Sequence, residues 1–411
     1  MTIPLISLQP PPKSHQRPTG AARAVRTVAV LVIAIIGFSS VCSGAEPDPK
    51  AVSNAPDATP AARPVAAQPT HSADDAAFLC QGRWNVESRQ ATTINNGSSV
   101  EFGYTGKSCR LVFDVTKAKI LPAIAVWVDG CGPTRVPLDD GGVVSIPAPP
   151  ASSVPPGAKI TRHTVRFLGV MDGGYLTKIN NWQSLEGAVV FRGVILEPGE
   201  SLFALPSSAP QIEFLGDSIT AGLAMVRDRN LPTYGPPDQY PEGNWPEWTA
   251  RWLGMRPVVT GFGGQGITHG GTGGVPSAPD AFGFVYQGKE WTPATKPAVV
   301  VIYQGTNDSE IQAPQYQAFL SKVRTAYPDA FLFAVVPHDR GKHAAAIQAA
   351  VQDSKDPRIF FLDYSQDVIG PADKADSCHL NPGGAVRLAT RLAGDIRSRI
   401  GVQPVSASGV K

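Results

Sequence analysis

The strongest constraint on the fold is a regular alternation of apolar runs and amphipathic segments between residues 210 and 400. Each apolar run has the length of a strand, and most are followed by a segment whose apolar residues recur at helical spacing. This alternation predicts an α/β domain over residues 206–402, a doubly wound, mostly parallel sheet with helices on both faces. The predicted strands are Ile212–Leu215, Pro257–Thr260, Ala298–Gln304, Phe331–Val336 and Arg358–Leu362, and the predicted helices are Pro246–Leu253, Pro314–Tyr327, Gly341–Asp353 and Gly383–Ile400.

Residues 78–205 carry a different pattern, with short runs of β-branched and aromatic residues separated by turn sequences such as Asn96-Gly97 and Asp129-Gly130. Strands at such short intervals predict a β-sandwich or jelly-roll domain ahead of the α/β domain. The predicted strands are Ser99–Tyr104, Ser108–Val115, Ile124–Val128, Val143–Ile146, Thr161–Leu168 and Gly187–Leu196.

The first 45 residues have the features of an export signal: Arg23 and Arg26, an apolar run over Val28–Phe38, and small residues ending at Ala45. The apolar run is too short for an ordinary transmembrane helix, so cleavage is favoured over an uncleaved anchor. Residues 46–77 are rich in Ala and Pro and are expected to be a disordered linker, and residues 403–411 a tail. The mature chain is therefore expected to be secreted or periplasmic, with no membrane contact.

The net charge is only +2, and the surplus comes from the basic residues before Ala45. Nothing in this balance favours nucleic acid as a partner. In an oxidising compartment the cysteines of the mature chain would form disulfides, and Cys109 with Cys131 is the preferred pair because both lie in the β-rich region. The cysteine spacing fits no zinc site, and no metal or cofactor is expected.

Polar residues follow several of the predicted parallel strands, and the carboxyl ends of such strands meet at one edge of a sheet. Ser218 supplies a hydroxyl, His379 a base, and Asp376 a carboxylate three residues before that base. Backbone N–H groups of Ser218 and Gly266 and the side-chain amide of Asn307 can donate to one oxyanion. This combination is typical of nucleophilic acyl transfer.

Each of these signals also has a plainer interpretation. Ser218 can cap a helix, Gly261–Gly266 spells a dinucleotide fingerprint that no helix follows, and His338 is a spare candidate for the base. Trp127 is expected in the sandwich core. Candidate platforms for sugar rings are Trp182, Trp245 and Trp291, whereas Trp248 and Trp252 are expected to pack within a helix.

The segments Gly216-Asp217-Ser218, Gly266, Gly305-Thr306-Asn307-Asp308 and Asp376-Ser377-Cys378-His379 resemble the four sequence blocks of the SGNH (GDSL-type) hydrolase superfamily. The resemblance covers about residues 211–400 and implies a flavodoxin-like sheet. It also implies Ser218 as nucleophile, Asp376 and His379 as its partners, and Gly266 and Asn307 in the oxyanion hole. Many members have Asn where this chain has Gly261.

The β domain narrows the resemblance, because Gly82-Arg83-Trp84, Val128-Asp129-Gly130 and His163-Thr164-Val165 are similar to carbohydrate esterase family two. That family implies an exported acetyl esterase acting on acetylated plant polysaccharides such as xylan and mannan. The protein is expected to be a monomer. Alternatives are a lipase or thioesterase, a peptidoglycan O-acetyl esterase, and a non-catalytic carbohydrate-binding protein. The hydroxyl position attacked and the acyl-chain preference stay open.

Overall fold

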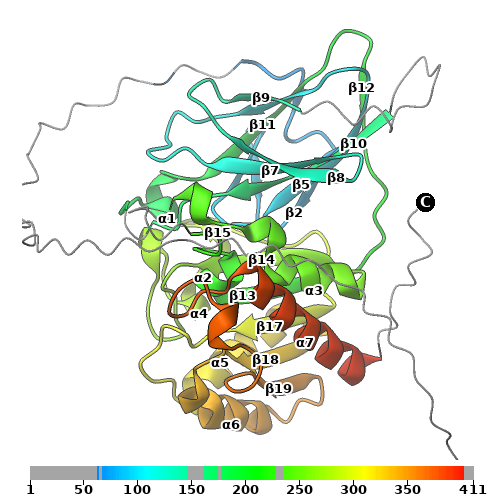
Figure 1. Cartoon of the computed structure of the whole chain (residues 1–411). Helices are drawn as coiled ribbons and strands as arrows, with labels where there is room; N and C mark the ends of the chain where they lie inside the picture. Colours follow the sequence, from blue (N-terminus) through cyan, green and yellow to red (C-terminus); the bar gives the residue numbers. More distant parts are fainter. Residues whose placement is uncertain (1–62, 64–66, 147–161, 175–176, 228–234, 402–411) are drawn as a thin grey trace, which may run out of the picture. The chain divides into compact units, whose positions relative to one another are not determined.

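The computed structural model describes residues 63, 67–146, 162–174, 177–227 and 235–401, and all of them belong to one compact unit spanning Pro60–Lys411. Within these residues two antiparallel sheets precede a parallel sheet in the chain (Figure 1). The predicted signal peptide, the tail and most of the predicted linker lie outside the described residues. Among the described residues, no helix combines the length and apolar character that crossing a membrane requires.

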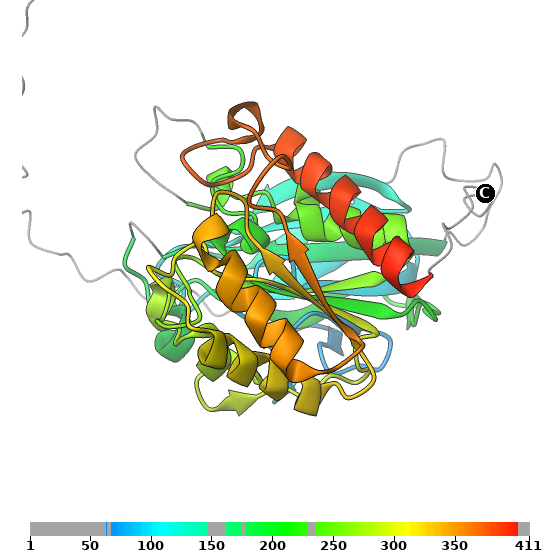
Figure 2. The ribbon, with the colours of Figure 1, turned by 90° about the horizontal axis from the view of Figure 1, so that it is seen from below.

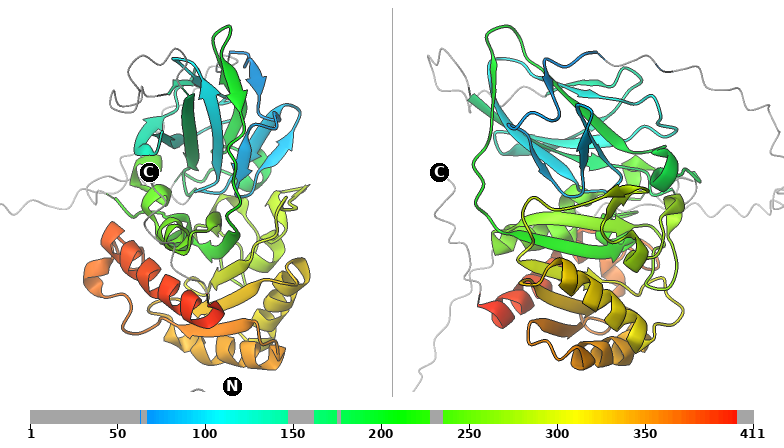
Figure 3. Two further views of the ribbon diagram at one scale, coloured as in Figure 1. Left: turned by 90° about the vertical axis from the view of Figure 1, so that its right-hand side faces the viewer. Right: turned by 180° about the vertical axis from the view of Figure 1, so that it is seen from behind.

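The two antiparallel sheets have six strands each and are seen from two further sides in Figure 3. Sheet A contains β3 (Asn85–Glu87), β4 (Gln90–Thr93), β11 (Val189–Ile195), β6 (Arg110–Phe113) and β9 (Val143–Ser145), with β1 (His71–Ser72) paired to β11. Sheet B contains β12 (Ser201–Phe203), β5 (Ser99–Thr105), β10 (Arg162–Val170), β7 (Ala123–Val128) and β8 (Cys131–Pro137), with β2 (Leu79–Gln81) paired to β5.

The β domain begins earlier than the sequence predicts. The predicted linker runs to residue 77, but His71 and Ser72 pair with Val194 and Gly193 of β11. Ala73, which follows them, is buried. The pairing uses backbone groups, which composition does not reveal, so an Ala-rich stretch can still complete a sheet.

Strand periodicity explains the core of the β domain. On β5 and β10 alternate residues such as Phe102 and Phe167 are fully buried between the two sheets, where aromatic rings pack edge to face. Trp127 does not join them. Its neighbours Val126 and Val128 point into the core, so Trp127 lies on the outer face of sheet B and the expectation of a core tryptophan is wrong.

The predicted disulfide is also wrong. Cys109 is buried just before β6 of sheet A, whereas Cys131 is exposed at the start of β8 in sheet B. The two cysteines therefore belong to different sheets. All four cysteines in the described part of the chain are free thiols.

The parallel sheet, sheet C, has the strand order β14-β13-β17-β18-β19, so the first strand in the chain lies between the second and the third. Its strand order reverses beside β13, and ligands of such sheets bind at that point, outside the carboxyl ends of the strands. The strands are β13 (Gln211–Asp217), β14 (Arg256–Phe262), β17 (Val299–Tyr303), β18 (Phe331–Val336) and β19 (Ile359–Asp363). A short hairpin, β15 (Phe284–Tyr286) with β16 (Lys289–Glu290), stands apart.

Helices cover both faces of sheet C, as the sequence predicts. Alternate residues of β17 point to opposite faces: Val299 and Val301 pack with α3 and α7, and Val300 and Ile302 with α5 and α6. Figure 2 shows α7 and α6 on the two sides of the strands. The helices are α1 (Asn181–Ser184), α2 (Ser218–Ala221), α3 (Trp245–Leu253), α4 (Ala278–Ala281), α5 (Ala313–Ala326), α6 (Ala344–Ser354) and α7 (Pro382–Ile400).

A buried ion pair links the β domain to the parallel sheet C. Arg83 of the β domain donates from Nη2 to Glu213 Oε1 on β13 at 2.8 Å, and only 1% and 0% of the two side chains are exposed. The guanidinium also donates to the Phe284 carbonyl and stacks on Trp291, 4.7 Å from the ring centroid. Strand β13, which leads to Ser218, is therefore held by the β domain as well as by its own sheet.

Removing one partner of this pair leaves the other charge buried and unpaired, which costs about 3–5 kcal/mol. We expect Arg83→Met to lower the free energy of unfolding by that amount in urea denaturation. The double variant Arg83→Met/Glu213→Leu should recover most of the loss, because an apolar pair of similar volume leaves no unpaired charge. A single variant as stable as the wild type would show that the pair is not needed.

Candidate active site

Ser218 stands at the end of the central strand, where the chain turns sharply. Asp217 ends β13 and caps the following helix, its Oδ1 accepting from the Ile219 backbone N–H at 2.9 Å. That helix, α2, is only four residues long, so its dipole adds little at the serine. The turn presents the Ser218 hydroxyl at the carboxyl edge of sheet C.

The predicted serine, histidine and aspartate are brought together across this edge. His379 Nε2 lies 2.9 Å from Ser218 Oγ, and His379 Nδ1 lies 2.8 Å from Asp376 Oδ2. Since a carboxylate only accepts, the hydrogen of the neutral imidazole is on Nδ1 and the Nε2 lone pair faces the serine hydroxyl. This is the arrangement in which a histidine can take the proton of a serine that attacks a carbonyl.

Charge and burial shift the ionisation of both partners. Burial alone would lower the pKa of His379, but the hydrogen bonds and charges of Asp376 and Cys378 together outweigh burial and leave that pKa above its ordinary value. Burial works against the ionised form of Asp376 too. The hydrogen bond from His379 and the backbone N–H groups of Cys378 and His379 nevertheless hold the pKa of Asp376 well below its ordinary range.

His338, the spare candidate for the base, makes hydrogen bonds within the protein instead. Its Nδ1 lies 2.8 Å from the Tyr303 hydroxyl and its Nε2 2.9 Å from the carbonyl oxygen of Cys378, and burial lowers its pKa. Both ring nitrogens are thus engaged inside the protein. His338 fastens the loop that carries Asp376 and His379 to strand β17.

Two of the three predicted oxyanion donors, Gly266 and Asn307, are already paired within the protein. The Gly266 N–H donates to the His269 carbonyl at 3.1 Å. The Asn307 side-chain amide donates to the Gln265 carbonyl at 2.9 Å and to Asp217 Oδ2 at 3.3 Å. A developing oxyanion would have to displace these partners, and the long bond to Asp217 is the weakest of them.

Two glycines in this region allow close approach of other groups. A Cβ at Gly266 would lie 2.6 Å from Asp308 Oδ1, and Asp308 also accepts from the backbone N–H groups of Ile267 and Thr268. A Cβ at Gly261 would lie 2.6 Å from the carbonyl oxygen of Asp217. The departure from the family pattern at Gly261 therefore lets strand β14 pack tightly against the turn before the serine.

The same loop contains the described side chains that could surround a metal ion. Ligand atoms of Asp376, Cys378 and His379 lie within 4.8 Å of one another. The Nδ1 of His379 already shares its hydrogen with Asp376, so metal binding there would compete with the hydrogen bond that orients the imidazole. The geometry suits the triad better than a metal.

Two of the three tryptophans predicted to be sugar platforms are buried. Trp245 is 0% exposed and packs against Phe214 and Tyr303 under the sheet, and Trp182 is buried beside Phe284. Both therefore lack an open face. Trp291 is half-buried, with the Arg83 guanidinium over its ring. The prediction of a platform is wrong for Trp245 and Trp182.

The supporting roles of three residues were not predicted from the sequence: Asp217 anchors Asn307, Asp308 anchors the Gly266 loop, and His338 anchors the loop that carries His379. Asp217 and Asp308 adjoin predicted site residues, which is a usable signal. His338 lies about 40 positions from its loop, and only the fold connects them.

The pH dependence of the rate follows from the raised pKa of His379. Ser218 is activated only while His379 is neutral, so the rate rises with pH through that pKa. We expect Asp376→Asn to move the midpoint of the acid limb of the kcat/KM profile to lower pH, because the carboxylate that raises the pKa is gone. It should also lower kcat by about 10³–10⁴-fold. An unmoved midpoint in the profile of the variant would contradict the role of Asp376.

Comparisons with known proteins agree with this geometry. Residues 214–387 match the model of the GDSL-like Lipase/Acylhydrolase family, a range that contains Ser218, Asn307, Asp376 and His379. A curated relative, the cellulase/esterase CelE of Acetivibrio thermocellus, is 27% identical over 279 residues. The match covers 62% of this chain, but only 33% of CelE.

Solved structures share the fold over most of the chain. A family two carbohydrate esterase from Clostridium thermocellum, in complex with cellohexaose, matches with a TM-score of 0.65 at 22% identity over 79% of this chain and 100% of its own. One from Cellvibrio japonicus gives 0.65 at 18% identity over 80% and 97%. An acetyl xylan esterase (Est2A) from Butyrivibrio proteoclasticus gives 0.62 at 16% identity over 81% and 96%. With its four blocks in order along sheet C, this chain carries a domain that matches the model of the GDSL-like lipase/acylhydrolase family, and the resemblance to the SGNH hydrolases is confirmed.

Proposed function

We propose that this protein is an exported serine esterase that removes O-acetyl groups from a polysaccharide of the acetylated xylan or glucomannan type. The hydrogen-bonded chain from Ser218 through His379 to Asp376 is the main support for this proposal. Export, a location outside the cytoplasm and action as a monomer belong to the same proposal and rest on the sequence features described above.

The reaction runs in two halves. Ser218 Oγ attacks the acetyl carbonyl carbon while its proton passes to His379 Nε2, and the resulting tetrahedral oxyanion collapses with transfer of that proton to the departing sugar oxygen. The products of this half are the free sugar hydroxyl and an acetyl ester on Ser218. A water molecule, deprotonated by His379, then attacks the acetyl ester and releases acetate and the serine hydroxyl. Asp376 stays ionised throughout and stabilises the imidazolium.

Charge on the carbonyl oxygen needs donors at the carboxyl edge of sheet C. We assign this role to the Ser218 and Gly266 N–H groups and to the Asn307 amide. The amide would exchange its 3.3 Å bond to Asp217 for a bond to the oxyanion, and Gly266 would release the His269 carbonyl. Catalytic hydrogen bonds are often unformed without substrate, so the present pairing is compatible with that role.

The substrate class is inferred from the relatives. The family two carbohydrate esterases share both parts of this chain, the antiparallel sheets as well as sheet C, since their structures align over 79–81% of it. The names of these proteins include an acetyl xylan esterase. A lipase, a thioesterase and a peptidoglycan O-acetyl esterase would use the same triad and differ in the ester that reaches Ser218.

Acetate release separates these substrates. We expect the wild-type protein to release acetate from acetylated xylan or acetylated glucomannan, and Ser218→Ala to lose about 10⁶-fold in kcat because the nucleophile is gone. Unfolding curves of the two proteins serve as the control for folding.

Release from O-acetylated peptidoglycan alone would keep the chemistry and move the substrate to the cell envelope. Cleavage of longer acyl esters with no acetate release from any polymer would contradict the acetylesterase. An unimpaired Ser218→Ala would contradict the mechanism.

A further inference from the structure

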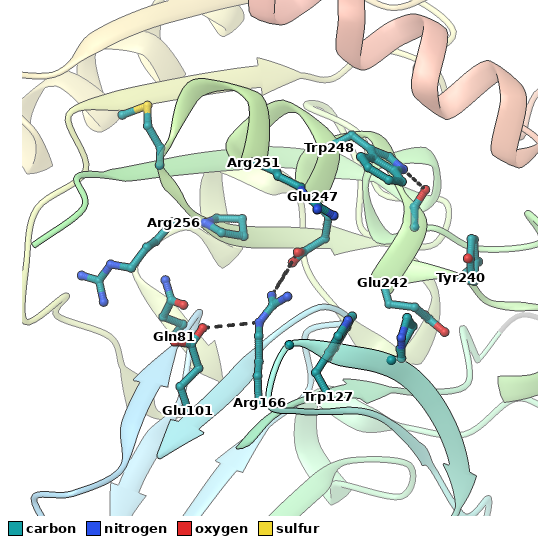
Figure 4. A pocket seen from close by; sticks show the side chains of 16 residues that line it. Gln81, Glu101, Trp127, Arg166, Tyr240, Glu242, Glu247, Trp248, Arg251 and Arg256 are labelled. Carbon is teal, nitrogen blue, oxygen red and sulfur yellow. Dashed lines mark hydrogen bonds and ion pairs between the residues drawn. The ribbon is translucent and has the colours of Figure 1, made fainter. Parts of the chain in front are cut away.

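A pocket lies away from Ser218, between the outer face of sheet B and helix α3 (Figure 4). Its volume is about 470 Å³, within the range of ligand-binding pockets. Its wall includes Arg256 and Pro257, the first residues of β14, whereas Ser218 follows the last residue of the parallel strand β13. β14 spans seven residues, about 20 Å, so a ligand here occupies the opposite end of sheet C.

The floor of the pocket is a row of side chains set by strand register. Arg166 of β10 stands opposite Glu101 of β5 on one side and opposite Trp127 of β7 on the other. Its guanidinium contacts Glu101 at 3.4 Å and Glu247 of α3 at 2.8 Å, and lies over the Trp127 ring, 4.8 Å from the centroid. The ion pairs to Glu101 and Glu247 fix the Arg166 guanidinium, which in turn fixes the ring of Trp127.

Aromatic rings border the cavity on two sides. Trp127 rises from sheet B, while Trp248 and Tyr240 come from the α/β domain (Figure 4). Trp127 and Arg166 also line an adjoining cavity of about 250 Å³. A tryptophan flanked by two cavities keeps part of its ring open to a ligand, although one face contacts Arg166.

Polar groups at the wall lack partners. Gln81 is 2% exposed and its Nε2 has no hydrogen-bond partner within the protein. Glu242 Oε2 and Arg256 Nη1 are also buried atoms with no hydrogen-bond partner. The other carboxylate oxygen of Glu242 pairs with Arg135. Buried polar atoms are normally paired, and these have almost no exposed area, so a small movement of the side chains would bring two donors and an acceptor to a ligand that carries hydroxyl groups.

Charge narrows the class of ligand. The wall carries three carboxylates, Glu101, Glu242 and Glu247, and three guanidinium groups, Arg166, Arg251 and Arg256. An anion would face the carboxylates and a cation the guanidinium groups, so the mixture favours a neutral molecule with both donors and acceptors. A pyranose ring has these properties, with an apolar face for an aromatic ring and hydroxyl groups for the polar atoms.

We infer that this pocket is a second saccharide-binding site, which holds a neutral sugar unit of a polysaccharide while another part of the chain reaches Ser218. Two points of attachment raise the effective concentration of the polymer at the serine without any new contact there. The delivery of the polymer to Ser218 rests on the proposed function, whereas sugar binding at this pocket is measured without turnover and can fail or succeed independently of it.

The test uses the full-length Ser218→Ala protein labelled with ¹⁵N, so that no ester is cleaved. Indole N–H resonances are followed during titration with xylohexaose and with cellohexaose, and Trp127 and Trp248 are assigned by their loss in Trp127→Phe and Trp248→Phe. We expect both resonances to shift in a saturable way with at least one sugar. Trp127→Ala should weaken the affinity reported by Trp248 roughly tenfold, whereas Trp127→Phe keeps a ring and most of the affinity.

Unfolding temperatures of the variants confirm that they fold, and an oligogalacturonate of equal length serves as the anionic control ligand. No shift of Trp127 or Trp248 with either neutral sugar, in folded protein, would overturn the inference. So would shifts confined to other indoles, affinity unchanged in Trp127→Ala, or tighter binding of the oligogalacturonate.

Discussion

The buried contact between Arg83 and Glu213 ties strand β13, and with it the turn at Ser218, to the β domain. Glu213 lies on β13, the strand that pairs with both β14 and β17 and ends at the turn that presents Ser218. A charge in the middle of a buried parallel strand is costly unless it is paired. The β domain supplies that partner, together with the rings of Phe282 and Trp291 around the guanidinium. The antiparallel sheets are thus part of the environment of the catalytic strand rather than a separate module attached to it.

From β13 outward, the site is built by register and by a second layer of polar contacts. Parallel pairing aligns Gly216 with Gly261 and with Tyr303, so the ends of three strands meet at one edge. Asp217, Asp308 and His338 then hold the three segments that carry Asn307, Gly266 and His379. These supporting residues touch no substrate in the proposed mechanism. They fix where the reacting groups stand, which is the larger part of catalysis by a pre-organised site.

Much of this was predictable because the relevant physics is local. Apolar periodicity located all five strands and the four long helices of the α/β domain to within three residues at each end. The rule that parallel strands end at one edge brought Ser218 and His379 together although 161 positions separate them. The predictions that were wrong depended on tertiary contacts, which the spacing of residues in the sequence does not reveal. Trp245 was predicted to be a sugar platform but is fully buried against the sheet. Cys109 and Cys131 were predicted to pair but lie beside strands of different sheets. Trp127 was assigned to the core, and its place on the outer face became clear only with the phase of β7.

The proposed mechanism requires an acetyl-enzyme on Ser218. The most direct measurement is rapid-quench peptide mass spectrometry of the wild-type protein mixed with 4-nitrophenyl acetate. We expect one acetyl group on the peptide containing Ser218, appearing in the first turnover and decaying as acetate is released. Steady turnover with no acetylated serine at any quench time, or an acetyl group that accumulates on another residue at the rate of the reaction, would contradict it.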